Sequence, residues 1–70
     1  MNLMNLTING ESVKIEESVQ SVQDLLGFFG LGDQVVIVEK NGSILEKSSH
    51  ATVQLSDGDR IEIVHFVGGG

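Results

Sequence analysis

Two Asn-Gly pairs, Asn9-Gly10 and Asn41-Gly42, constrain the fold of this chain more than any other feature of its sequence. Both residues of such a pair tolerate the positive φ angles of a tight turn, and the pair is the strongest short-range signal for a β-hairpin when it separates apolar strands. The first pair lies between an apolar segment at residues 3–8 and an alternating segment at residues 12–15. These two segments are predicted to form a β-hairpin, and the second pair predicts another turn later in the chain.

The residues after the first hairpin have the periodicity of a short amphipathic helix. Ser21 is a suitable N-cap because its hydroxyl can accept a hydrogen bond from a first-turn amide, and Gly30 and Gly32 are suitable stops. The apolar stripe of this helix is expected to consist of Val22, Leu25, Leu26 and Phe29. We expect one helix of about two to three turns, with this stripe facing a sheet.

The remaining sequence predicts further strands. A β-branched run at residues 35–40 reads as a strand, and residues 43–45 form a short return strand after the second Asn-Gly pair. Residues 52–55 are predicted to form another short strand, and residues 61–67 the last one. The expected fold is therefore α+β, a mixed sheet of about four to five strands with one helix packed on one face. The last strand is expected at the centre, beside the first.

The core must come from aliphatic side chains, because the 70 residues contain no cysteine for a disulfide or a thiolate metal site. A chain of this length forms one small domain. The core is expected to draw on Leu3, Leu6, Ile8, Val13, Ile15, Val22, Leu25, Leu26, Val35, Ile37, Val53, Leu55, Ile61 and Ile63.

The net charge of −6 excludes several classes of partner. Nucleic acids and anionic lipids both require clustered Lys and Arg, so no nucleic-acid or membrane partner is expected. An acidic domain suits partners that present a positive surface. No apolar run has the length of a membrane span and no signal-peptide pattern is present, and together with the absence of cysteine this favours a cytoplasmic protein.

The glycines at positions 68–70 point to the function. Glycine adds nothing to a core and loses the most entropy on ordering, so this run is expected to be a flexible tail after a domain at residues 1–67. Its backbone can enter a narrow site closely, and the α-carboxylate of Gly70 is unhindered. The expected role is to carry that carboxylate into the active site of a partner, with Gly68 and Gly69 threaded behind it.

A docking patch is predicted next to this tail. If Ile61 and Ile63 face the helix, alternation places Val64 and Phe66 on the open face of the sheet. In the neighbouring strand we assign Val35 and Ile37 to the helix side. Exposed apolar patches commonly mark partner sites. The predicted patch comprises Val36, Val38, Val64, Phe66 and Val67.

Other chemistry is poorly supported. His50 and His65 lack further ligands at a metal-binding spacing, so no metal site is expected. His50 is assigned to a polar loop and His65 to packing at a strand end. The acidic cluster of Asp57, Asp59 and Glu62 is interpreted as a solvated turn. Because a domain of this size has little room to enclose a catalytic pocket, the chain is not expected to be an enzyme.

The whole chain resembles the ThiS family, the ubiquitin-like β-grasp sulfur carriers of thiamin biosynthesis. The resemblance is carried by the strand Val36-Ile37-Val38-Glu39 and the ending Ile61-Glu62-Ile63-Val64-His65-Phe66-Val67-Gly68-Gly69-Gly70. Many members end on two glycines, whereas this chain has three. The resemblance implies that a ThiF-like adenylyltransferase uses Mg-ATP to convert the Gly70 carboxylate into an acyl-adenylate, while the chain itself binds no cofactor. Sulfur from a donor such as a cysteine desulfurase then gives a thiocarboxylate, which thiazole synthase consumes.

Three alternatives remain open from the sequence. The small subunit of molybdopterin synthase resembles the same fold and ends in Gly-Gly, although it lacks the Ile-Val-His-Phe-Val ending. A ubiquitin-like modifier would pass the same adenylate to an amine. An interaction domain with an inert tail would keep its function after deletion of Gly70.

Overall fold

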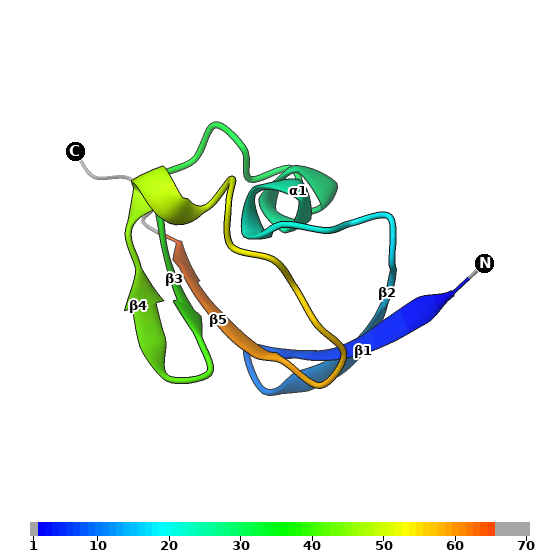
Figure 1. The fold of residues 1–70 in the computed structure, drawn as a ribbon. Helices are drawn as coiled ribbons and strands as arrows, with labels where there is room; N and C mark the ends of the chain where they lie inside the picture. Colours follow the sequence, from blue (N-terminus) through cyan, green and yellow to red (C-terminus); the bar gives the residue numbers. More distant parts are fainter. Residues whose placement is uncertain (1, 66–70) are drawn as a thin grey trace.

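In the computed structural model, which describes residues 2–65, the last strand lies at the centre of a five-stranded mixed sheet (Figure 1). The strand order is β2-β1-β5-β3-β4. Strand β5 runs parallel to β1 and antiparallel to β3, so it joins the two hairpins, as predicted. The strands are β1 (Leu3–Ile8), β2 (Glu11–Glu16), β3 (Val36–Lys40), β4 (Ser43–Leu45) and β5 (Arg60–His65).

Both hairpins turn at the predicted Asn-Gly pairs. The φ angles are 50° and 85° at Asn9 and Gly10, and 51° and 88° at Asn41 and Gly42. Positive φ at both central residues is the type I′ geometry, whose twist matches that of the flanking strands. The antiparallel register, Ile8 opposite Glu11 and Lys40 opposite Ser43, follows from these turns.

Helix α1 (Val22–Phe28) begins at the predicted cap, Ser21. The Ser21 hydroxyl accepts a hydrogen bond from the Asp24 amide at 3.0 Å, and the Asp24 carboxylate accepts one from the Ser21 amide at 3.2 Å. This reciprocal pair satisfies two amides that have no partner within the helix. Figure 1 shows α1 over one face of the sheet. Within residues 2–65, no helix is long and apolar enough to cross a membrane.

The helix ends in a Schellman motif centred on Gly30. Gly30, at φ 74°, donates to the Gly27 carbonyl at 3.0 Å, and Leu31 donates to the Leu26 carbonyl at 2.8 Å. The motif turns the chain back over the sheet, so Leu31 packs against the core. Phe29, predicted to lie in the apolar stripe, is instead exposed, because the chain has already left the helix at this residue.

The segment between β4 and β5 differs from the prediction. Residues 47–49 form a 3₁₀ helix, and residues 52–55 form no strand, only a single bridge between Gln54 and Ser21. The carbonyls of His50 and Val53 accept hydrogen bonds from the Gln23 and Val22 amides. This segment is therefore used to satisfy the free amides at the start of α1 instead of extending the sheet.

The core lies between α1 and the sheet and differs from the predicted set in and just before strand β3 and at the start of β1. Val38 is fully buried, whereas Leu3, Val35 and Ile37, all predicted to be buried, are exposed. Four successive apolar residues at 35–38 provide no alternation that would identify the buried face. The buried core consists of Met4, Leu6, Ile8, Ile15, Val22, Leu25, Leu26, Val38 and Ile61.

Candidate functional site

Strand β5 leads to the predicted tail, and the described residues stop at His65. Phe66, Val67, Gly68, Gly69 and Gly70 lie outside the described residues, so their predicted roles remain predictions. The structure does place the end of β5, at His65, from which these residues continue. His65 is opposite Val36 on β3, and its Nε2 lies 3.1 Å from Oε1 of Gln34 in the connection between α1 and β3.

An apolar patch lies beside the end of β5, on the face of the sheet opposite the helix. Ile37 is directly across from Val64 in the β3–β5 ladder, and the two side chains are 39% and 50% exposed. Ile44 on β4 shares the same face and is 70% exposed. We call Ile37, Ile44 and Val64 the open-face patch. Exposed apolar groups gathered on one face are typical of a surface that docks a partner.

The predicted patch was wrong at Val36 and Val38. Val38 is directly across from Ile63 and is 0% exposed, and Val36 is half-buried against the core. Directly opposite residues in an antiparallel ladder share a face, so pairing with Ile63 directs Val38 toward the helix. Ile37 takes the place on the open face that the sequence reading gave to its two neighbours.

Two glutamates lie beside the open-face patch. Glu39 and Glu62 are directly opposite each other across β3 and β5, and Ile44 is in turn opposite Glu39. Like charges directly across a ladder disfavour the sheet. Glu39 and Glu62 are each partly buried, which limits their screening by solvent. The open-face patch therefore has two carboxylates at its edge. This arrangement of charge suits a partner surface with basic side chains.

In the turn before β5, Asp57 is exposed as predicted, whereas Asp59 is not. Asp59 is buried, and it accepts hydrogen bonds from the Ser56 amide at 2.8 Å and from Nδ2 of Asn41 at 3.1 Å. Asp57 accepts a hydrogen bond from the backbone amide of Asn5 at 2.6 Å. Two of the three residues of the predicted acidic cluster therefore hold the turn against its neighbours, and only Glu62 lies on the open face.

The turn asparagines hold β5 at its two edges. Oδ1 of Asn9 accepts from the Ile63 amide at 2.7 Å, and Nδ2 of Asn9 donates to the Ile63 carbonyl at 3.2 Å. On the other edge, Oδ1 of Asn41 accepts from the Arg60 amide at 2.9 Å, and the Asn41 amide donates to the Arg60 carbonyl at 2.8 Å. The sequence identified both residues as turn formers but gave no sign of these side-chain contacts.

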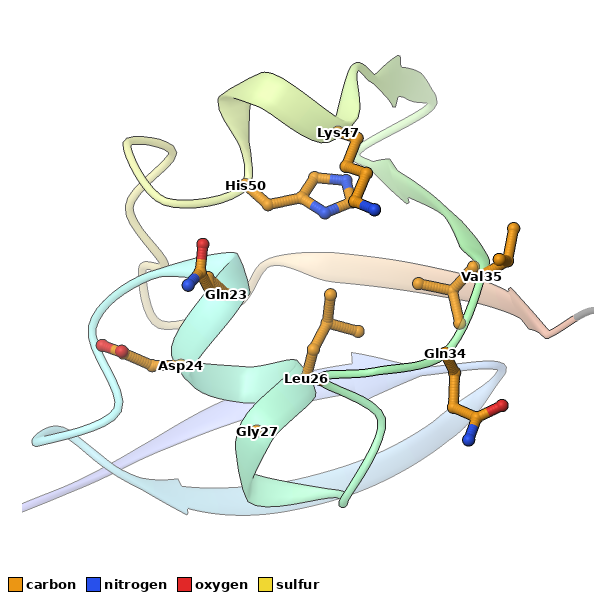
Figure 2. Close-up of a pocket in the computed structure, with 10 residues that line it drawn as sticks. Gln23, Asp24, Leu26, Gly27, Gln34, Val35, Lys47 and His50 are labelled. Carbon is orange, nitrogen blue, oxygen red and sulfur yellow. The ribbon is translucent and has the colours of Figure 1, made fainter.

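His50 is buried, contrary to its assignment to a polar loop. Its side chain lies next to Lys47 in a groove of about 520 Å³ between α1 and the segment after β4, with Gln23 and Leu26 on the helix side (Figure 2). The imidazole Nε2 has no hydrogen-bond partner among the described residues. Within residues 2–65, no three His, Asp or Glu side chains are grouped so that they could hold a metal ion.

Comparison with known proteins places this fold and its C-terminal strand in one family. A family model described as the ThiS family matches residues 3–70. The chain belongs to the ThiS family. It is 48% identical over 65 residues to the sulfur carrier protein ThiS of Bacillus subtilis. The aligned residues cover 93% of this chain and 98% of that protein.

Solved structures and longer relatives agree with this family assignment. The crystal structure of the thiamine biosynthesis protein ThiS from Geobacter metallireducens matches with a TM-score of 0.79 and 35% identity, over 96% of this chain and 100% of that one. This likeness confirms the predicted ubiquitin-like β-grasp fold. The ThiS-family chain is also 48% identical over 67 residues to a thiazole synthase of Paramagnetospirillum magneticum, of which it spans only 20%.

Proposed function

We propose that this ThiS-family chain is a sulfur carrier protein of thiamin biosynthesis whose reacting group is the carboxylate of Gly70. The observation that carries the proposal is the near full-length match to the Bacillus subtilis sulfur carrier, over 98% of that protein. The fold supports it, because β5, the last strand before the glycines in the sequence, is the central strand and is held on both edges. The chain acts as a protein co-substrate and not as an enzyme.

The chemistry follows from the low reactivity of a carboxylate. A Gly70 carboxylate oxygen attacks the α-phosphorus of Mg-ATP in a ThiF-like adenylyltransferase, which releases pyrophosphate and leaves an acyl-adenylate. A persulfide donor, supplied by a cysteine desulfurase or a related enzyme, attacks the acyl carbon and displaces AMP. Reductive cleavage of the resulting S–S bond by a thiol leaves the Gly70 thiocarboxylate. Gly68 and Gly69 present no side chain that would obstruct this carbon.

The open-face patch is proposed as the surface that docks the adenylyltransferase. Ile37, Ile44 and Val64 provide its apolar centre, and Glu39 and Glu62 favour a partner with basic residues at the corresponding position. Phe66 and Val67 are expected to continue the contact toward the active site. Such a partner relieves the repulsion between the two carboxylates, so electrostatic complementarity favours the correct enzyme.

Thiazole synthase is proposed as the acceptor of the sulfur. Two proteins that carry this name, from Paramagnetospirillum magneticum and Magnetococcus marinus, contain a segment similar to this chain over 96% of its length. That segment is 20% of each protein. A carrier and an acceptor joined in one chain keep the thiocarboxylate at high local concentration near its target.

Intact mass spectrometry tests this function. The chain is incubated with a ThiF-like adenylyltransferase, Mg-ATP and a sulfur donor, and its mass is expected to rise by the difference between a sulfur and an oxygen atom. The variant that lacks Gly68, Gly69 and Gly70 is expected to show no change, because it has no glycine tail to carry a carboxylate to the ATP. If the adenylyltransferase modifies another carrier but leaves this chain unchanged, the sulfur-carrier proposal is wrong.

A further inference from the structure

The β1–β5 ladder ends before β5 does. Ile8 is the last residue of β1 and lies opposite Ile61. Asn9 then continues the pairing, because its backbone amide donates to the Ile61 carbonyl at 2.9 Å and its side chain bonds to both backbone groups of Ile63. A side-chain amide offers one donor and one acceptor in a plane, as a peptide unit does, so it stands in for the next residue of the strand.

Position 9 must satisfy two requirements at once. It needs a positive φ, here 50°, because the hairpin turns there, and it needs a planar amide to pair with Ile63. Glycine meets the first requirement alone. Aspartate tolerates the turn, but it has no donor for the Ile63 carbonyl and places negative charge against it. Asparagine meets both requirements, so the turn alone does not explain why asparagine occupies position 9.

We propose that Asn9 is a positioning residue of the carrier, which fixes the direction in which the chain leaves β5 toward Gly70. This inference rests on the proposed function. Beyond Ile61, the β1 side of β5 is bonded only through Asn9 among the described contacts, while β3 holds the other side. Loss of the Asn9 amide releases one edge of the strand immediately before the tail. The freed residues must then be ordered in the partner's active site, at a cost in conformational entropy.

Asn41 offers a matched control. Its side-chain Oδ1 accepts a hydrogen bond from the Arg60 amide, on the opposite edge and at the far end of β5, while its Nδ2 donates to Asp59 and its backbone amide donates to the Arg60 carbonyl. It has the same turn geometry, with φ 51°. Replacing either asparagine with glycine keeps the turn and removes the side-chain bonds. Only the bonds of Asn9 lie next to the residues that lead into the tail.

The test compares Asn9→Gly and Asn41→Gly in the full chain. For each variant, the free energy of unfolding is measured in urea, the dissociation constant for the adenylyltransferase is measured without ATP, and the kcat for pyrophosphate release is measured at saturating carrier. Asn9→Gly is expected to lower kcat about fivefold or more, a factor that lies within the range for the loss of its two side-chain hydrogen bonds. Its dissociation constant stays unchanged, because Val64 is still paired with Ile37. Asn41→Gly is expected to leave kcat unchanged.

Either of two results overturns the positioning role: an unchanged kcat for Asn9→Gly, or an equal loss in both variants, which would indicate general destabilisation. Absence of pyrophosphate release from the unaltered chain would instead contradict the proposed function itself. If Asn9→Gly does not fold, Asn9→Asp provides the same comparison, since it keeps the turn and one acceptor. It is expected to show the same selective loss of kcat.

Discussion

The side-chain amide of Asn9 is hydrogen-bonded to both the amide and the carbonyl of Ile63, 54 positions away in the sequence. One residue thus forms the first hairpin turn and also holds the last strand. The local signal, an Asn-Gly pair, predicts the turn, and the long-range contact exists only because β5 lies beside β1.

Replacement of Asn9 by alanine should cost more stability than replacement by glycine. Both variants lose the two bonds to Ile63, and alanine also places a Cβ at φ 50°. We expect a loss of about 1–2 kcal/mol for Asn9→Gly, and about 1–2 kcal/mol more for Asn9→Ala. Urea unfolding of both variants measures the difference. Equal losses would mean that the positive φ angle at position 9 does not disfavour alanine relative to glycine.

A charge in the open-face patch should weaken binding to the adenylyltransferase without unfolding the domain. Val64→Asp places a carboxylate at a side chain that is 50% exposed, opposite Ile37. We expect binding to weaken by more than about 1 kcal/mol, as measured by isothermal titration calorimetry with the purified enzyme.

Leu3→Asp is the control for this substitution. Leu3 is an exposed apolar residue and the first of β1, a strand that β5 separates from β3 and β4 in the sheet. It should bind as the unaltered chain does. If both variants bind equally well, the open-face patch takes no part in docking; if both are equally impaired, the effect is one of charge alone.

Removal of one carboxylate from the open face should change stability and binding in opposite directions. Glu62 lies directly opposite Glu39, so Glu62→Gln relieves a repulsion within the sheet. We expect the free energy of unfolding to rise by about 0.2–1 kcal/mol, and the affinity for the adenylyltransferase to fall, most strongly at low salt. Glu17→Gln, at an exposed residue beyond β2, should change neither quantity. A gain in affinity for Glu62→Gln would contradict a basic partner surface.

His50 provides a test of a buried polar atom. Its Nε2 has no hydrogen-bond partner among the described residues although the side chain is 5% exposed. Removing an unsatisfied polar atom from such a site is favourable, so His50→Leu should raise the free energy of unfolding by about 1 kcal/mol. The comparison is His65→Leu, which loses the contact with Gln34 and should gain nothing. Lower stability in His50→Leu, measured by urea unfolding, would show that the imidazole makes a stabilising contact.

The sequence predicted those parts of the fold that depend on local chemistry. The turns at Asn9 and Asn41 follow from positive φ, and the start of α1 follows from the Ser21 cap. The central place of β5, beside β1, was also expected, because the crossover through the helix should be right-handed. These features depend on a few residues or on overall connectivity, and both can be read without coordinates.

The missed features depend on which residues meet in space. The buried face of β3 is set by the pairing of Val38 with Ile63, and a continuous run of β-branched residues does not identify that register. The burial of His50 depends on the packing of its segment against the start of α1, through the hydrogen bond from the Gln23 amide to the His50 carbonyl. The docking patch was therefore predicted on the correct side of β5 at Val64 but on the wrong residues of β3.

The central position of β5 also affects how the molecule is made. A ribosome completes both hairpins before it reaches Arg60, yet the hairpins join one sheet only through β5. A two-stranded hairpin is marginally stable in water, so an unfinished chain leaves its apolar faces exposed to proteases. A molecule that has folded must already contain the strand that precedes the glycines. A chain that stops before Arg60 therefore lacks the strand that unites its two hairpins in one sheet.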